Sequence, residues 1–134
     1  MIDPTPQPAP TDEPDAWHPL CPSSQLQDAG QACVFDVTYD GQTCTAFAVR
    51  YQGAVHAYLN RCSHVAMEMD WRPGHFFDLT GHYLVCASHG ALFRPADGAC
   101  VGGPGRGPLI KIQAEEREGW VFWRSQYRLR PVAF

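Results

Sequence analysis

Apolar and polar residues alternate along both halves of the chain. In residues 32–39, Phe35 and Val37 alternate with Asp36 and Thr38. A period of two places successive side chains on opposite faces of a strand, so this run is predicted to be half-buried. We therefore expect an all-β fold.

Short turn sequences separate the predicted strands. Asp40 and Gly41 favour a tight hairpin turn, Gly53 favours another, and residues 118–119 form a third. Only a short helix after Ser24 is allowed by the pattern, because no long stretch has a helical period. The predicted strands cover residues 17–21, 32–39, 43–51, 55–60, 109–113 and 120–124.

The middle of the chain has a different character. From residue 61 to 107, short apolar pieces such as residues 83–85 stand between loops that are rich in glycine. Glycine permits tight turns and a close approach of the backbone to another group. We expect an antiparallel β sandwich base, built from both ends of the ordered chain, with a loop-rich subdomain of about residues 61–109 inserted into it.

The net negative charge of the chain comes from its first 15 residues. This segment holds five prolines, four acidic residues and no basic residue, and it is predicted to be a disordered tail. Residues 16–134 are formally neutral, because the tail carries as many acids as the net charge of -4 requires. This balance does not favour nucleic-acid binding. No apolar run approaches the roughly 20 residues of a membrane span. The segment also lacks the pattern of a secretory signal, so we expect a cytoplasmic protein.

Six cysteines in such a chain are first considered as metal ligands or buried thiols. The nearest candidate disulfide joins Cys33 and Cys44 across the first hairpin. A two-residue turn at residues 40–41 would place Cys44 opposite Val37 instead. Cys21, Cys33, Cys44 and Cys100 are therefore expected to be reduced.

Two tight loops each carry one cysteine and one histidine. Cys62 and His64 lie in the first loop, and Cys86 and His89 lie in the second. A two-iron cluster needs two ligands on each iron, and two facing loops could supply both cysteines to one iron and both histidines to the other. The alternative is a structural zinc site, because two cysteines and two histidines can also close a tetrahedron around Zn²⁺. A red-brown oxidised protein would exclude zinc.

At these residues the chain resembles the Rieske family, in particular the Rieske ferredoxins and the isolated Rieske domains of oxygenases. The resemblance implies one [2Fe-2S] cluster per chain, held by Cys62, His64, Cys86 and His89, and a Gly-Pro loop that covers its third side. The motifs are Cys62-x-His64, Cys86-x-x-His89-Gly90, Phe93, and the loop from Gly103-Pro104 through Gly105 to Pro108-Leu109.

Departures from the family pattern imply a low potential. High-potential members carry a disulfide between the ligand loops, where this chain has Met67 and Ser88. They also place a serine and a tyrosine as hydrogen-bond donors where this chain has Ala91 and Phe93. The ligand loops are also further apart than in most Rieske ferredoxins, and we interpret the extra residues, within 68–80, as a surface excursion.

The resemblance implies an electron carrier rather than an enzyme. Rieske oxygenases carry a second, larger domain with a mononuclear iron, for which 134 residues leave no room. The sequence shows neither a nucleophile paired with a base nor a pair of carboxylates that would indicate a substrate site. The expected partners are a reductase as donor and an oxygenase as acceptor. The alternative is a redox or regulatory subunit of a larger complex, similar to the small subunit of nitrite reductases.

Overall fold

The computed structural model describes residues 16–61, 68–87, 90–103, 107–126 and 129–132. The predicted tail, residues 1–15, lies outside them. The described part of the chain contains no helix that is long and apolar enough to cross a membrane.

The described residues form antiparallel strands, which confirms the predicted all-β class. Within the described ranges, the one helical element is the 3-10 turn η1 (Ser23–Gln25), at the position where the sequence allowed a short helix. The strands are β1 (Trp17–Pro22), β2 (Cys33–Tyr39), β3 (Gln42–Tyr51), β4 (Ala54–Leu59), β5 (Leu84–Val85), β6 (Leu92–Phe93), β7 (Cys100–Gly102), β8 (Lys111–Ile112), β9 (Ala114–Arg117), β10 (Trp120–Arg124) and β11 (Leu129–Pro131).

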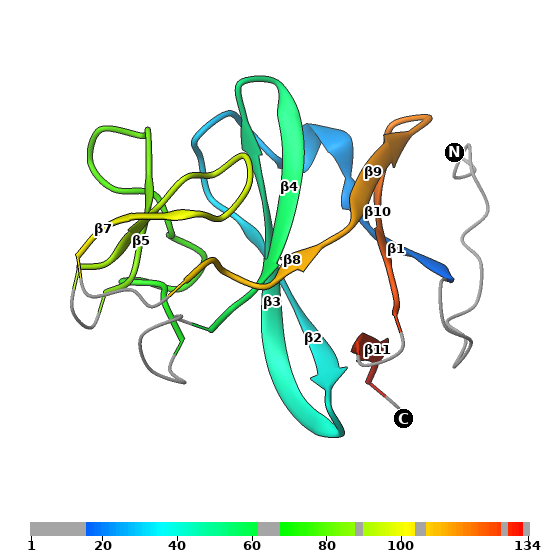
Figure 1. The fold of residues 1–134 in the computed structure, drawn as a ribbon. Coiled ribbons are helices and arrows are strands. Elements are labelled where there is room, and N and C mark those ends of the chain that lie inside the picture. Colours follow the sequence, from blue (N-terminus) through cyan, green and yellow to red (C-terminus); the bar gives the residue numbers. More distant parts are fainter. Residues whose placement is uncertain (1–15, 62–67, 88–89, 104–106, 127–128, 133–134) are drawn as a thin grey trace.

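Three sheets organise these strands. The central sheet has the order β11-β2-β3-β4-β8, a second sheet has the order β1-β10-β9, and a small third sheet has the order β5-β6-β7. Figure 1 shows β5 and β7 on one side of the central sheet and β1, β9 and β10 on the other. Only Gln113 separates β8 from β9, so the chain passes directly from the central sheet into the second one. Both ends of the described chain thus contribute to one base.

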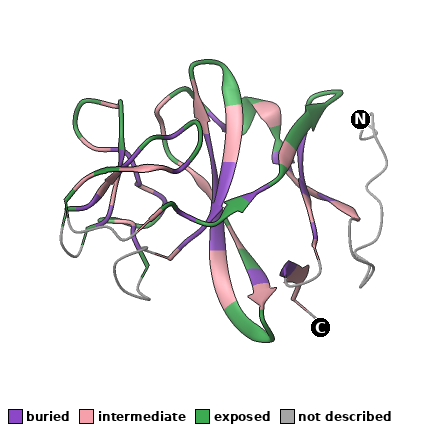
Figure 2. Ribbon diagram, viewed as in Figure 1, coloured by how far each residue is buried: buried purple, intermediate pink, exposed green. Residues whose placement is uncertain are grey.

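The central sheet is buried on both faces at its middle. Phe47 and Val49 of β3 pack on the side of β5 to β7, whereas Ala46 and Ala48 pack on the side of the second sheet. This explains why residues 46–49 form a continuous apolar run, because a strand that is covered on both faces has no polar side. Figure 2 shows the buried stretch along β3 and β4.

The segment 68–80 is only in part the surface excursion that was predicted from sequence. Met69 and Phe76 are fully buried, and the ring of Phe76 stacks on Phe47 with 3.7 Å between centroids and 12° between planes. Its aromatic side chains cover the large apolar residues of β3, which would otherwise face water. The exposed residues of the segment, which match the prediction, are Glu68, Trp71, Arg72, Pro73, Leu79 and Thr80.

Histidine 18 lies between the central and second sheets. It is 3% exposed, and its ring lies 4.7 Å from the ring of Trp123, at 35°. Neither ring nitrogen has a hydrogen-bond partner among the described residues. Burial disfavours the charged imidazolium, and the pKa of His18 is therefore lowered.

This burial predicts a loss of stability in mild acid. An unfolded chain binds a proton at this histidine near its ordinary pKa of 6.5, whereas the folded chain does not. The stability that His18 contributes to the folded state is therefore fully present above about pH 6.5, and it declines as the pH falls through the lowered folded pKa. His18→Phe should flatten this dependence in denaturant titrations between pH 7.5 and 5. Equal pH dependence in both proteins would contradict the assignment.

Candidate metal centre

Only one of the four predicted ligands lies within the described residues. Cys86 directly follows β5 and is fully buried, whereas Cys62, His64 and His89 lie outside the described residues. Among the described side chains, no group of three or more histidines, cysteines or acids could hold a metal. The site is therefore defined by the backbone that surrounds these positions.

The side chain of Asn60 links the two ends of the first ligand loop through hydrogen bonds. Asn60 follows β4 and is 4% exposed. Its amide nitrogen donates to Thr45 Oγ1 at 3.1 Å and to Asp70 Oδ1 at 3.3 Å, and its Oδ1 accepts from the backbone N–H of Met69 at 2.8 Å. Residues 60 and 69–70, on either side of the loop, are thereby held together.

The second ligand loop is closed by its own backbone and joined to the first. The N–H of Cys86 donates to the carbonyl of Ala91 at 2.9 Å, and the N–H of Gly90 donates to the carbonyl of Cys86 at 2.8 Å. The N–H of Ala87 donates to the carbonyl of Met69 at 2.9 Å. Because Met69 is also bound by Asn60, hydrogen bonds connect the bases of the two loops.

A third loop approaches the second so closely that it requires a glycine. A Cβ on Gly103 would lie 2.7 Å from Ala91 Cα and 2.9 Å from the carbonyl oxygen of Gly90. Gly103 also has a φ of +74°, which L side chains rarely adopt. It is the first residue of the predicted Gly-Pro loop, whose Pro104 and Gly105 lie outside the described residues. Three loops therefore converge around the position of Cys86.

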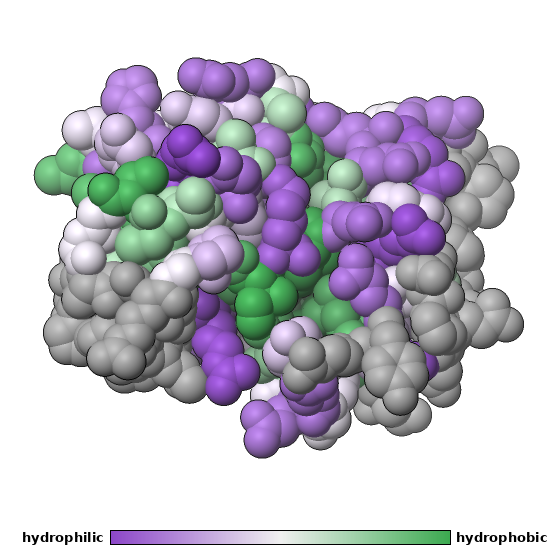
Figure 3. Space-filling model, viewed as in Figure 1, coloured by the Kyte–Doolittle hydropathy of each residue, from purple (hydrophilic) through white to green (hydrophobic). Residues whose placement is uncertain are grey.

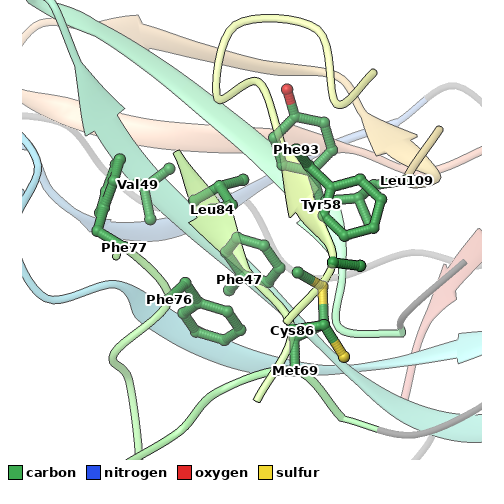
Figure 4. Close-up of a cluster of buried hydrophobic side chains, with 11 residues drawn as sticks. Phe47, Val49, Tyr58, Met69, Phe76, Phe77, Leu84, Cys86, Phe93 and Leu109 are labelled. Carbon is green, nitrogen blue, oxygen red and sulfur yellow. The ribbon is translucent and has the colours of Figure 1, made fainter. Parts of the chain in front are cut away.

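The surroundings of Cys86 fit an iron-sulfur cluster. Its thiol belongs to a cluster of buried side chains that includes Met69, Ala91 and Phe93 (Figure 4). A soft thiolate is the ligand that iron-sulfide units take. Ala91 and Phe93 are fully buried, and their side chains carry no hydrogen-bond donor. This part of the site is apolar, and its contacts to the loops come from backbone groups.

Sequence analysis missed the residues that position the loops. Asn60 and Asp70 belong to no ligand motif, although a polar residue at the end of an apolar strand, two positions before Cys62, is a usable signal. Asp70 also accepts the N–H of Gly74 through Oδ2 at 3.1 Å. These side chains therefore shape the segment that follows the first ligand loop.

An apolar hollow lies beside the second ligand loop. It has a volume of about 310 Å³, and its lining includes Trp71, Leu79, Val85, Cys86 and Gly90. Other hydrophobic residues reach the surface at the same end of the molecule, such as Val101 of β7, which is 47% exposed. Figure 3 shows hydrophobic residues among hydrophilic ones at the left of the view, where Figure 1 places β5 and β7.

The chain matches a known family over most of its length. The model of the Rieske [2Fe-2S] domain matches residues 16–114. No curated protein matches the chain in sequence.

Solved structures support the same fold. The ferredoxin of carbazole 1,9a-dioxygenase from Nocardioides aromaticivorans IC177 is 23% identical with a TM-score of 0.63, over 82% of this chain and 97% of that one. The terminal oxygenase of carbazole 1,9a-dioxygenase from Novosphingobium sp. KA1 is also 23% identical with a TM-score of 0.67, over 90% of this chain and 32% of that one. This chain thus spans about a third of the oxygenase. The match of the domain model and the converging loops lead to one conclusion: the chain belongs to the Rieske [2Fe-2S] domain family.

Proposed function

We propose that residues 16–134 form one Rieske domain, in which Cys62, His64, Cys86 and His89 hold the [2Fe-2S] cluster within residues 61–109. The position of Cys86 supports this ligand set, because it is buried at the point where three loops converge. When bound, such a cluster accepts and releases a single electron. The described residues provide one buried ligand, Cys86, and an apolar wall that includes Met69, Ala91 and Phe93.

The function that follows is electron transfer from a reductase to an oxygenase, without catalysis by this chain alone. The observation that carries this proposal is the match to a ferredoxin over 97% of that ferredoxin's length. The hollow that includes Trp71, Leu79 and Cys86 offers a redox partner an apolar surface next to a ligand. A cytoplasmic location suits a carrier that collects electrons from a soluble reductase.

Purification from the native host tests this role. A carrier should elute alone, at the size of a chain of 14.9 kDa or a small oligomer of it, and its reduced form should be reoxidised by a host fraction that contains an oxygenase. Stoichiometric copurification with a larger enzyme would instead support a permanent redox subunit.

Removing a proposed ligand should remove the cluster. Cys86→Ser is expected to abolish the visible and EPR signals of the cluster, because serine lacks the soft sulfur. Cys100→Ser is the matched control, since Cys100 packs against the same buried cluster as Cys86, donates a weak hydrogen bond to the Gly102 carbonyl at 3.5 Å and is not a proposed ligand. Retention of the signals in Cys86→Ser would contradict the ligand set. A colourless wild-type protein that contains zinc would contradict the cofactor.

Gly103→Ala should open the site. The added methyl group would meet the backbone of residues 90–91, and overpacking of this kind costs about 1–3 kcal/mol. We expect a lower melting temperature and a lower iron content. Gly41→Ala is the control, because its φ of +78° carries the same strain and nothing lies within 4 Å of the new Cβ. If the two variants lose equal stability and iron, the close approach has no role.

The lack of donors predicts a low reduction potential. Donors near the cluster sulfurs stabilise the reduced state, and Ala91 and Phe93 provide none from their side chains. We expect a midpoint of roughly -150 to 0 mV at pH 7, in the lower part of the Rieske range, and a higher value in Phe93→Tyr. Protein-film voltammetry measures both. A wild-type midpoint above about +150 mV would indicate a respiratory type of centre.

A further inference from the structure

Two cysteines meet between the sheets of the base. Cys21 lies in β1 of the second sheet, and Cys33 lies in β2 of the central sheet. Both side chains pack in the same group between these two sheets, where their thiols lie within hydrogen-bonding reach of each other. Cys21 is 3% exposed, whereas Cys33 is only half-buried. No disulfide joins any of the cysteines that the structure describes.

A β-bulge brings Cys21 to this position. The pairing of β1 with β10 shifts between Pro19 and Cys21, so Leu20 is an extra residue on β1. Without the shift, alternation from the buried His18 would turn Cys21 outward, but with it both residues are buried. On β2, Cys33 shares its inward face with Phe35 and Val37, which pack in the same group of side chains as Cys21.

The two thiols are not equivalent. The contact between the thiols lowers the pKa of Cys33 and, together with burial, raises the pKa of Cys21. The positive charge of Arg50 lowers the pKa of Cys21. Its guanidinium is bound to Glu116 at 2.8 Å, however, and the negative charge of Glu116 raises the same pKa. Cys33 is therefore the more acidic and the more accessible of the pair, which are the properties of an attacking thiol.

We propose that Cys21 and Cys33 are a reversible dithiol site, which hydrogen peroxide converts to an intramolecular disulfide between β1 and β2. The Cys33 thiolate attacks one peroxide oxygen, the O–O bond breaks, and the released hydroxide takes a proton to leave as water. The Cys21 thiol then attacks the sulfur of the Cys33 sulfenic acid and expels a second water. The two thiols lose two electrons, and one peroxide is reduced to two waters.

The site is separate from the proposed cluster. Cys21 and Cys33 pack with the side chains between the central and second sheets, whereas Cys86 packs on the opposite face of the central sheet. The disulfide would link the two sheets of the base and leave the ligand loops unchanged. A small-molecule dithiol such as dithiothreitol would restore both thiols by exchange.

Peptide mapping of the full, cluster-containing chain tests the proposal. No lysine or arginine precedes Arg50, so trypsin leaves Cys21, Cys33 and Cys44 on one peptide. Chymotrypsin instead can place them on residues 21–26, 27–35 and 40–47. After exposure to hydrogen peroxide and alkylation of the remaining thiols, the digest is analysed without reductant. The expected product links peptides 21–26 and 27–35, in roughly tenfold excess over any link to residues 40–47.

Three variants decide the order of the steps. Cys21→Ser should stop the reaction at a sulfenic acid on Cys33, which dimedone traps, and Cys33→Ser should leave Cys21 reduced. Cys44→Ser should form the same disulfide as the wild type, because Cys44 lies opposite Val37 and outside the pair. The proposal is overturned if the wild type accumulates dimedone adducts at Cys33 without the disulfide, or if Cys21 reacts equally in Cys33→Ser.

Discussion

A buried asparagine side chain holds together the part of the molecule that carries its chemistry. The amide of Asn60 offers donors and an acceptor at once, and Thr45, Asp70 and Met69 use them. In an interior of low polarity an unsatisfied amide would be costly, so the segment after β4 has few alternatives to this arrangement. The second ligand loop depends on it indirectly, because the carbonyl of Met69 receives the N–H of Ala87.

The central sheet contributes to two cores. Its face toward the second sheet carries the small residues Ala46, Ala48 and Ala57 together with larger ones such as Leu59 and Ile112. Its other face carries Phe47 and Tyr58, which pack with buried residues of β5 and β6. The Tyr58 hydroxyl donates to the Pro95 carbonyl at 2.6 Å, so this core side chain also anchors the loop that contains Pro95.

Local patterns predicted the strands and turns, because alternation and glycine turns are encoded within a few residues. The hairpin at Asp40 was predicted with its register, and Cys44 does lie opposite Val37. The burial of Phe76 was not predictable, because it depends on a strand far away in the chain and has no local period. The motifs of the proposed ligands are local in the sequence, whereas Asn60 and the bulge before Cys21 act only through tertiary neighbours.

The pairing of the two chain ends sets the order in which this protein can assemble. The hydroxyl of Ser125 is hydrogen-bonded to the backbone of Ala16, 109 residues earlier, so the second sheet closes only after residue 125 has been made. Contacts of such long range slow folding, because loop entropy is lost before they form. The hairpins of β2, β3 and β4 are local and can form first. Because β8 pairs with β4, the segment between these two strands leaves the central sheet at β4 and returns to it beside the same strand. Cluster insertion can therefore follow a scaffold that is already paired on both sides of it.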